Sequence, residues 1–404
     1  MLQGGSSFHN DSRYAPAIKK PSSRMRKGTA MKNNQQKTKR VSPLRLIAGI
    51  LLRIIAAVLI FVVALIGVLT IGEYRPADAE EIEVQAGAES PAAAQAELPV
   101  AGEPIRLVSW NIGYGALGDN ADFFMDGGES VMTADKERVK ENMDGIIANL
   151  QETDADIMLL QEVDIDSKRS RHVDETQLMR DAFPDYNNAF AYNYKVSYVP
   201  YPLPPIGKVE SGLLFMTHYQ LTESTRVSLP CPFNWPVRVA NLKRCLLVNR
   251  IPVEGSDKQL VVIDLHLEAY DSGEGKIAQT KALLGVLEEE RSKGNYVIAG
   301  GDFNQLFSNV DAGAYPVYEG RWQPGVIEAG DFGDGWSLLM DNQAPTCRSL
   351  DQPYAGADLS AFQYYMIDGF IVSDNVEVRS LTTQDQEFVD TDHNPVVMDV
   401  VLKE

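Results

Sequence analysis

Polar residues suited to metal and phosphate chemistry stand where the apolar runs of this sequence end. The stretch "YVIAGGDFNQ" (296–305) begins as a buried strand, but it ends with Asp302 and Asn304, two residues apart on one side of an extended chain. The same pattern recurs at Asn111 in "SWN", Glu162 in "LQEVD", His266 in "DLHLE", Asp368 in "YMIDGFIVS", and Asp392 and His393 in "DTDHNP". Each residue alone also suits a turn or a cap, so only the set indicates chemistry.

As a set, these side chains point to hydrolysis of a phosphate ester by a metal-activated water. Carboxylates and amides are the hard oxygen ligands that Mg²⁺ prefers, and imidazoles transfer protons near neutral pH. A divalent ion held by Glu162, with help from Asn111, would neutralise charge on the phosphoryl oxygens and so stabilise the transition state. The expected cofactor is Mg²⁺, with Mn²⁺ as the next choice.

Short strands and two amphipathic helices must position these residues. The predicted strands cover residues 106–110, 156–161, 212–217, 245–251, 259–267, 366–373 and 394–402. The helix between the first two strands carries one apolar stripe, made of Val139, Met143, Ile146, Ile147 and Leu150. The second helix covers about residues 275–293, with Gly294 as its stop signal. Strands with helices spaced among them indicate an α/β or α+β sandwich in one domain.

Five motifs in this order, "SWN", "LQEVD", "GDFN", "IDGFIVS" and "DHNP", resemble those of the endonuclease/exonuclease/phosphatase superfamily. That group includes deoxyribonuclease I, abasic-site endonucleases, inositol-polyphosphate 5-phosphatases and neutral sphingomyelinases. The resemblance covers about residues 104–402. It implies an α/β (α+β) fold, namely a four-layer sandwich of two packed mixed β-sheets flanked by helices, with the active site at one edge.

The resemblance also implies a role for each residue of the set. Asp302 would orient the attacking water, and Asn304 would donate to a phosphate oxygen. Asp368 would hydrogen-bond His393, fixing its tautomer and raising its basicity, so that His393 acts as general base or phosphate clamp. Asp392 would contribute a metal or phosphate contact beside it.

His266 indicates that the expected substrate is a phosphodiester. It stands where the deoxyribonuclease I-like and sphingomyelinase-like members keep a second histidine that protonates the leaving oxygen, and such members mostly cleave phosphodiesters. Asp264 departs from the resemblance, because a small or neutral residue is more usual there. Three interpretations stay open: Asp264 holds His266 protonated, binds a second ion, or is a solvated edge residue.

The first part of the chain has the composition of a membrane anchor. Residues 1–75 hold 13 Lys and Arg against 2 Asp and Glu, which leaves 24 against 54 for the remainder, so a charge of +11 precedes one of −30. The stretch 54–71 has no charged residue, and with the apolar residues before it predicts a transmembrane helix over 45–72. The basic flank predicts a cytoplasmic N-terminus and an extracellular catalytic domain on the plasma membrane.

The segments around this helix complete the expected domain plan. Residues 1–44 are expected to be a disordered basic tail, residues 73–102 an Ala/Glu/Pro-rich tether, and residues 103–404 the catalytic domain. The alternative is a cleaved signal peptide, because Ala77-Asp78-Ala79 has the spacing of a cleavage site. Cys231 and Cys245 could form a disulfide outside the cell, which would leave Cys347 unpaired.

The sequence restricts the substrate only loosely. The aromatic and Pro-rich stretch 191–207, which contains Asn193, could line the cleft, touch the membrane or simply pack as a loop. Arg348 and the basic stretch 167–171 could supply cations for phosphate. A net charge of −30 disfavours a long polyanion, so a phospholipid or head-group phosphodiester is preferred to DNA or RNA.

A catalytically inert surface binding module is the alternative of another class, and no protein partner is indicated. His172 and His218 are expected at the surface, and His9 in the tail.

Overall fold

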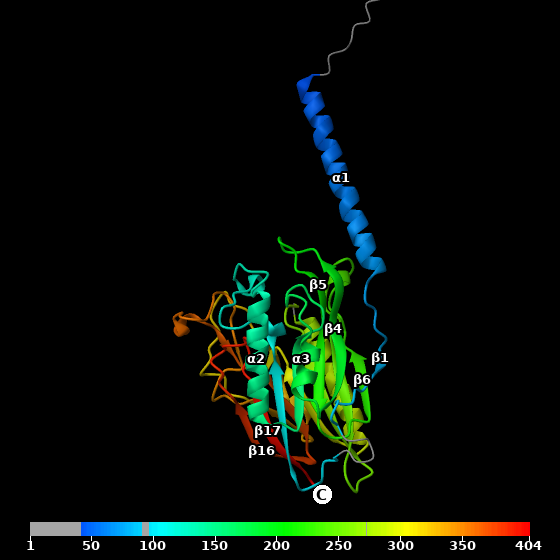
Figure 1. Ribbon diagram of the computed structural model, residues 1–404, viewed down its shortest axis with the longest axis vertical. Coiled ribbons are helices and arrows are strands. Elements are labelled where there is room, and N and C mark those ends of the chain that lie inside the picture. Colours follow the sequence, from blue (N-terminus) through cyan, green and yellow to red (C-terminus); the bar gives the residue numbers. More distant parts are fainter. Residues whose placement is uncertain (1–41, 91–96, 272) are drawn as a thin grey trace, which may run out of the picture. The chain divides into compact units, whose positions relative to one another are not determined.

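The computed structural model describes residues 42–90, 97–271 and 273–404, and the centre of the fold is a pair of mixed β-sheets packed face to face (Figure 1). The six-stranded sheet has the order β16 (Val376–Thr383), β17 (Val396–Leu402), β2 (Pro104–Asn111), β3 (Ile157–Asp164), β5 (Gly207–Thr217), β4 (Asn187–Val199). The seven-stranded sheet has the order β1 (Ala79–Ile82), β6 (Glu223–Ser228), β7 (Cys245–Pro252), β8 (Gln259–His266), β9 (Tyr296–Asp302), β15 (Asp368–Ser373), β12 (Trp336–Leu339). Two short pairs are β10 (Gln305–Phe307) with β11 (Gly325–Ile327), and β13 (Cys347–Arg348) with β14 (Tyr364–Tyr365).

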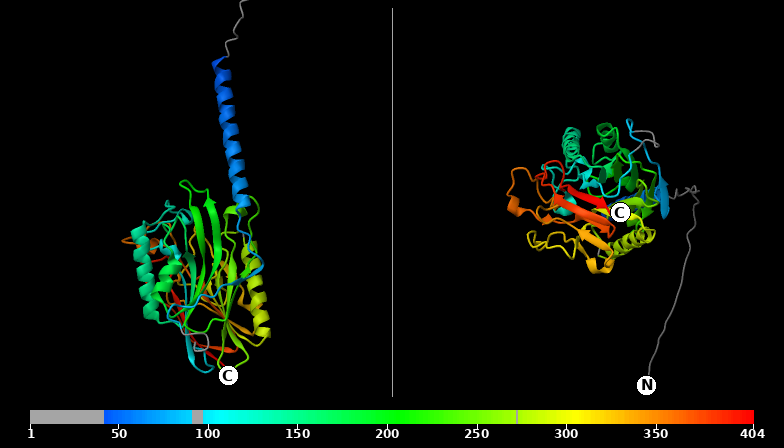
Figure 2. Two further views of the ribbon diagram at one scale, coloured as in Figure 1. Left: turned by 45° about the vertical axis from the view of Figure 1, so that its right-hand side comes forward. Right: turned by 90° about the horizontal axis from the view of Figure 1, so that it is seen from below.

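Helices cover the outer faces of both sheets. α2 (Lys136–Thr153) and α3 (Glu175–Ala182) pack their apolar side chains against the six-stranded sheet, and α4 (Glu274–Ser292) packs against the seven-stranded sheet (Figure 2). A further apolar cluster fills the space between the sheets, where Leu159 of β3 and Ile298 of β9 are fully buried. Because burying the apolar faces of both sheets requires this stacking, the layers follow from the strand patterns. They confirm the predicted four-layer α/β (α+β) sandwich.

The predicted strands and helices are found within a few residues of their expected bounds. The predicted stop signal holds, since α4 ends just before Gly294, whose φ of 81° is a left-handed conformation that glycine adopts readily. The sequence reading missed α3, which is only eight residues long. It also missed β4, β6, β12 and β16, where polar residues interrupt the alternation of apolar ones.

The apolar N-terminal segment forms one long helix. α1 (Pro43–Ile71) has 29 residues and is long and apolar enough to cross a membrane, although a signal sequence passes the same test. It coincides closely with the predicted span 45–72. Most of the predicted tail, residues 1–41, lies outside the described residues.

The segment after α1 differs from the free tether expected over residues 73–102. Part of it forms β1, which pairs antiparallel with the edge strand β6, and Gln85 and Glu97 bridge to Asn188 and Tyr219. The edge of a sheet offers unpaired backbone groups, and this segment satisfies them. Residues 73–90 and 97–102 are therefore part of the folded domain rather than a spacer.

The predicted disulfide is wrong. Cys231, Cys245 and Cys347 are all free thiols. Cys245 opens β7 and is buried in the core between the sheets, whereas Cys231 is exposed in the preceding loop, where its Sγ lies 3.8 Å from the Leu242 carbonyl oxygen. The two side chains thus have separate environments, and sequence spacing could not reveal this.

Candidate active site

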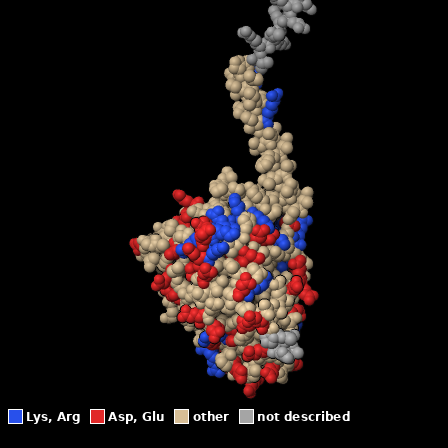
Figure 3. All heavy atoms as spheres, viewed as in Figure 1, with Lys and Arg blue, Asp and Glu red and all other residues tan. Residues whose placement is uncertain are grey.

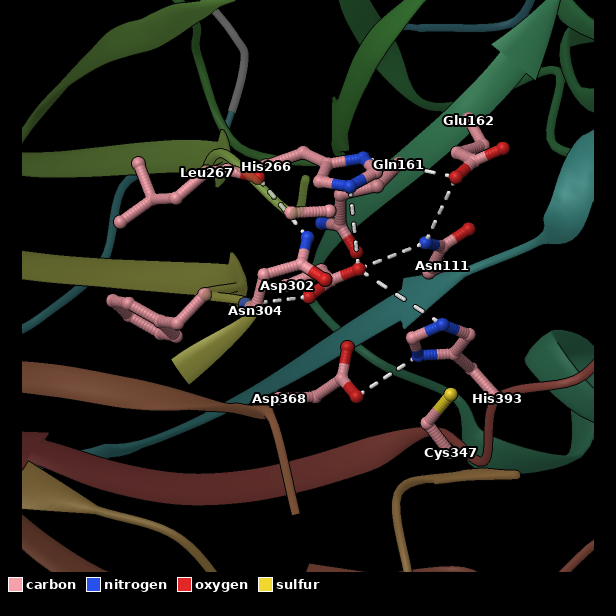
Figure 4. Close-up of polar contacts among 12 residues, drawn as sticks. Asn111, Gln161, Glu162, His266, Leu267, Asp302, Asn304, Cys347, Asp368 and His393 are labelled. Atoms are coloured by element: carbon pink, nitrogen blue, oxygen red, sulfur yellow. Dashed lines mark hydrogen bonds and ion pairs between the residues drawn. The ribbon is translucent and has the colours of Figure 1, made fainter. Parts of the chain in front are cut away.

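The site lies where strands from both sheets end at one edge of the sandwich (Figure 4). Asn111 ends β2, Asp302 ends β9, and the Asn111 Nδ2 donates to the Asp302 Oδ2 across 3.1 Å. β8 runs parallel to β9, so His266 is level with Asp302. β15 runs antiparallel to β9, so its first residue, Asp368, also lies opposite Asp302. The sheet register alone thus gathers these side chains around one carboxylate.

The two glycines before Asp302 allow this close approach. Gly301 has φ 150°, and a side chain there would collide with the Leu265 carbonyl of β8. A side chain at Gly300 would collide with the Phe370 ring of β15. Only glycine therefore lets β9 lie between its neighbours in this conformation and place Asp302 between His266 and Asp368.

A bulge in β3 presents Glu162. The pairing of β3 with β5 shifts between Leu160 and Val163, and Glu162 has the positive φ of 55°. Such a bulge re-aims a side chain, here into the cleft that Asn111 and His393 also line. The Asn111 Nδ2 is 3.5 Å from the Glu162 Oε1, so the predicted metal pair is brought together.

The two histidines approach Asp302 from opposite sides. The His266 Nε2 lies 3.3 Å and the His393 Nε2 3.9 Å from the Asp302 Oδ2. The His393 Nδ1 in turn lies 2.9 Å from the Asp368 Oδ2, as predicted for the pair that fixes its tautomer. The Trp110 Nε1 donates to the His393 carbonyl oxygen and holds its backbone.

These contacts separate the protonation states of the two imidazoles. Burial lowers the pKa of His393, but the Asp368 carboxylate outweighs it and raises that pKa well above the usual range. Burial, with the Arg244 and His393 cations nearby, lowers the pKa of His266 well below its usual range. Burial and the neighbouring Asp368 carboxylate raise the pKa of Asp302 to about 7. These shifts favour the charged form of His393 and the neutral form of His266, and they bring the pKa of Asp302 close to neutral pH.

Asn304 completes the motif at the end of β9. Its backbone N–H donates to the Asp302 Oδ1, and its Nδ2 donates to the Leu267 carbonyl oxygen at 3.0 Å. An amide nitrogen carries two hydrogens, so one N–H remains to donate toward the cleft. The positive φ of 50° at Asn304 suits asparagine better than most residues.

The donor set beside Glu162 fits a hard divalent ion. The Glu162 side chain keeps 25% of its surface exposed, and the His266 Nδ1, 4.0 Å away, is a buried nitrogen with no hydrogen-bond partner among the described residues. Carboxylate oxygen is the ligand of choice for Mg²⁺. The Asn111 Oδ1 accepts from the Gly113 N–H, so this amide would have to turn over to offer its oxygen to an ion.

Two further predicted residues also lie at the cleft. Asp392 is buried, and burial raises its pKa; its side chain lies close to those of His393 and Cys347. Asn193 occupies a bulge of β4, is buried, and has an Oδ1 with no partner in the described structure. An unsatisfied buried amide oxygen costs free energy unless a ligand or water satisfies it, so Asn193 remains a substrate-binding candidate.

Arg348 does not fit the predicted role of substrate cation. Its guanidinium donates to the backbone carbonyls of Leu117, Gly118 and Ser349 and stacks over the Tyr354 ring. These contacts engage both terminal nitrogens of the guanidinium, which a bidentate phosphate would need, and leave only Nε without a partner among the described residues. The residue therefore holds loops together, and nothing in its sequence context distinguished this role from phosphate binding.

The positive charge expected of Arg348 in the cleft comes instead from Arg169, which belongs to the basic stretch 167–171. It pairs with Asp164 at 2.9 Å, lies 3.7 Å from the Glu162 Oε2, and stacks on the Tyr114 ring. It thus positions Glu162 and offsets part of the negative charge of the cleft. The run of charges pointed to this segment, but the contact with Tyr114 had no signal in the sequence.

The structure argues against two of the three interpretations of Asp264, namely a solvated edge residue and a carboxylate that holds His266 protonated. It is fully buried between the sheets and accepts from the Gln161 Nε2 at 2.7 Å, so it is no solvated edge residue. Burial raises the pKa of Asp264 well above its usual range, which favours the neutral carboxyl, and its side-chain partner is Gln161 rather than His266. His172 is exposed, as expected, whereas His218 is half-buried beside Asp156.

Sequence reasoning missed several polar residues of the cleft, among them Asp126 and Tyr270. Burial and the Asp392 and Glu162 carboxylates raise the pKa of Asp126 to about 7. Asp126 ends a three-residue 3₁₀ helix and Tyr270 lies in a loop, and neither segment has a periodic pattern, so no sequence signal was available.

Both the sequence and the fold of this chain are similar to those of known proteins. The sequence profile of the Endonuclease/Exonuclease/phosphatase family matches residues 108–386. No curated protein matches the sequence significantly. The chain is similar in structure to an endonuclease/exonuclease/phosphatase from Beutenbergia cavernae, with 17% identity and a TM-score of 0.49, over 74% of this chain and 72% of that one. A Bacteroides vulgatus structure of the same description has 17% identity and a TM-score of 0.48, over 74% of this chain and 100% of that one.

A further similar structure is the human Nocturnin catalytic domain with bound sulfate, at 18% identity and a TM-score of 0.46, over 78% of this chain and 100% of that one. The family assignment rests on the sequence profile, which covers well over half of the residues. This chain belongs to the endonuclease/exonuclease/phosphatase family of phosphoester hydrolases.

Proposed function

We propose that this protein is a membrane-anchored, Mg²⁺-dependent phosphodiesterase that acts on a phospholipid or its head group. The observation that carries the proposal is the arrangement around Asp302, whose carboxylate lies within 4 Å of both His266 and His393 and beside the Asn111–Glu162 pair. A cationic and a neutral imidazole around a carboxyl near neutrality can bind a phosphate and move protons at the same centre.

Each residue would take one part of the reaction. Glu162 would hold the divalent ion, which when bound neutralises charge on the phosphoryl oxygens. The His393 cation would bind a phosphate oxygen, and Asp302 would accept the proton of the attacking water. His266, being neutral, would offer its N–H to the leaving oxygen, and Asn304 its free N–H to the phosphate.

An exposed apolar rim around the cleft favours a lipid over a nucleic acid. We define the apolar rim as Met125, Tyr201, Leu203, Trp235 and Val237, each at least 45% exposed. Three of them line the cleft that contains Glu162 and His393. Tyr201 and Leu203 are 70% and 88% exposed in the hairpin between β4 and β5. Gathered apolar side chains of this kind mark lipid or protein contacts.

The charge distribution agrees with that preference. Nucleic-acid interfaces gather Lys and Arg into a stripe, because phosphate contacts supply most of their affinity. On the face shown in Figure 3, acidic and basic side chains are interspersed, and residues 76–404 carry 54 acidic against 24 basic side chains. A lipid head group at the cleft needs no such stripe.

The membrane anchor would be α1, with the basic N-terminal segment in the cytoplasm and the catalytic domain outside the cell. Twenty apolar residues suffice to span a bilayer, and α1 has 29 residues. Protease added to intact cells should then remove the catalytic domain and leave the N-terminus in the membrane fraction. A domain protected from protease would reverse this orientation, and a mature protein that lacks residues 1–79 would identify a signal peptide.

The substrate is tested with the full chain reconstituted in phospholipid vesicles with Mg²⁺. Sphingomyelin, phosphatidylinositol, DNA, RNA and a nitrophenyl phosphodiester are supplied in parallel. We expect hydrolysis of a phospholipid and of the nitrophenyl ester. Cleavage of DNA or RNA without lipid hydrolysis would make the protein a nuclease, and no hydrolysis of any substrate would make it a binding module.

The apolar rim gives the same assay a matched pair of variants. Leu203→Ser removes a rim side chain that is 88% exposed, and Leu359→Ser removes a leucine that is also exposed, at 52%, but does not belong to the rim. Leu203→Ser should lower turnover of vesicle phospholipid and leave the nitrophenyl ester unaffected. Equal phospholipid turnover by the two variants would exclude a role of the rim in lipid contact.

A further inference from the structure

A thiol lies beside the catalytic histidine, and the proposed reaction does not use it. Cys347 opens β13, and its backbone bridges antiparallel to that of His393, which brings the two side chains together. The Cys347 sulfur points toward the His393 ring in Figure 4. The Cys347 Sγ lies 3.4 Å from the Arg348 carbonyl oxygen and also within hydrogen-bond reach of the His393 ring.

Asp392 completes a set of three ligands of different kinds. The Cys347 Sγ, a ring nitrogen of His393 and a carboxylate oxygen of Asp392 all lie within 4.8 Å of one another. All three residues are buried, yet all three line the cleft that contains Glu162. An ion in the cleft therefore has access to them.

The chemistry of this set differs from that beside Glu162. Thiolate, imidazole and carboxylate are the ligands that bind Zn²⁺, with tetrahedral geometry and room for a fourth ligand such as water. Mg²⁺ avoids sulfur and prefers oxygen ligands in octahedral arrangement. The cleft thus offers a hard site at Glu162 and a softer one at Cys347, and they select different ions.

We infer that Cys347, Asp392 and His393 form an inhibitory site for Zn²⁺ or another thiophilic divalent cation. On binding, the thiol loses its proton to solvent and the thiolate forms a bond to the ion. The His393 ring likewise loses a proton to solvent and gives the freed nitrogen lone pair to the same ion. It can then no longer carry a proton on that nitrogen and act as the phosphate-binding cation, so the ion and the substrate compete for one imidazole. The ion binding stands by itself, whereas the inhibition rests on the proposed function.

Three variants of the full chain separate this site from the others. Cys347→Ser removes the sulfur ligand and is the test. Cys231→Ser removes the exposed thiol, and Cys245→Ser removes the buried thiol of the core, so both serve as matched controls. None of the three cysteines has a part in the proposed hydrolysis, so activity with Mg²⁺ should be retained in all variants.

The activity test titrates Zn²⁺ against hydrolysis of a nitrophenyl phosphodiester at saturating Mg²⁺. Cys347→Ser should raise the Zn²⁺ concentration for half-inhibition by about tenfold or more, because loss of a metal ligand weakens binding at least as much as loss of its outer partners. Both control variants should match the wild type. Equal Zn²⁺ sensitivity of wild type and Cys347→Ser would overturn the inference.

A spectroscopic test needs no activity at all. Co²⁺ takes the place of Zn²⁺, and a cobalt–thiolate bond gives a charge-transfer band in the near ultraviolet. The band should appear in the wild type and in both control variants, and disappear in Cys347→Ser. Absence of the band from the wild type, or its persistence in Cys347→Ser, would overturn the site. A band without any hydrolysis would keep the ion site and refute the proposed function instead.

Discussion

Replacing Asp368 tests how the site is organised around its cationic histidine. The Asp368 Oδ2 lies 2.9 Å from the His393 Nδ1, both side chains are buried, and this carboxylate raises the pKa of His393 well above its usual range. Asp368→Asn keeps the shape of the side chain and removes its charge. A hydrogen bond to a charged group contributes about 1.5–3 kcal/mol, so kcat/KM should fall about 10- to 150-fold.

Asp374→Asn is the matched control for this variant. Asp374 directly follows the other end of β15, its side chain is 55% exposed, and it pairs with Arg291 at the surface. Both variants are assayed on a nitrophenyl phosphodiester at saturating Mg²⁺, and their thermal unfolding is followed by circular dichroism. The reasoning is refuted if folded Asp368→Asn keeps kcat/KM within about threefold of Asp374→Asn.

Three further predictions address the leaving group, stability and thiols. His266→Ala removes a hydrogen-bond donor to the leaving oxygen, so it should lose more activity on a natural phosphodiester, whose leaving oxygen carries more negative charge, than on a nitrophenyl ester; equal loss on both would assign His266 to phosphate binding. Burial raises the pKa of Glu290, but its hydrogen bonds with Arg250, Lys293 and Asn295 outweigh burial and lower that pKa to about 2. A lowered pKa stabilises the fold above the unfolded value of 4.5, and the contribution disappears as pH falls toward 2. Glu290→Gln should therefore lower the free energy of unfolding by about 3 kcal/mol at pH 7 and by much less at pH 3, as urea titration at the two pH values would reveal. A thiol reagent should label one cysteine in the native protein, the exposed Cys231, and three after unfolding without reductant; fewer than three would indicate a disulfide.

The sequence predicted those site residues that stand directly at the ends of apolar strands. Asn111, Asp302 and Asp368 each follow or begin such a strand, so the sheet register alone brings them together. The pairing of Asp368 with His393 was implied by resemblance and is observed at 2.9 Å. Strand ends are thus informative because backbone pairing fixes where their side chains lie.

Residues whose role depends on loops or on packing between sheets could not be predicted in this way. Arginine is a residue type that often binds phosphate, but the Arg348 guanidinium donates hydrogen bonds to three backbone carbonyl oxygens instead. Asp264 shares a strand face with His266, yet Gln161 of the other sheet is its partner. Asp126 reaches the cleft from a short 3₁₀ helix with no periodic pattern. Contacts between distant segments decide all three cases, and local sequence does not encode them.

The central claim is that Glu162 holds a divalent ion required for phosphodiester hydrolysis, and metal depletion tests it most directly. The full chain is assayed on a nitrophenyl phosphodiester after EDTA treatment and during Mg²⁺ titration, beside Glu162→Gln and the surface control Glu289→Gln, whose side chain is 67% exposed. EDTA should abolish turnover and Mg²⁺ should restore it in the wild type and in the control. Glu162→Gln should lower kcat by about 10²-fold or more at saturating Mg²⁺. Undiminished turnover by Glu162→Gln in the presence of EDTA would contradict the account.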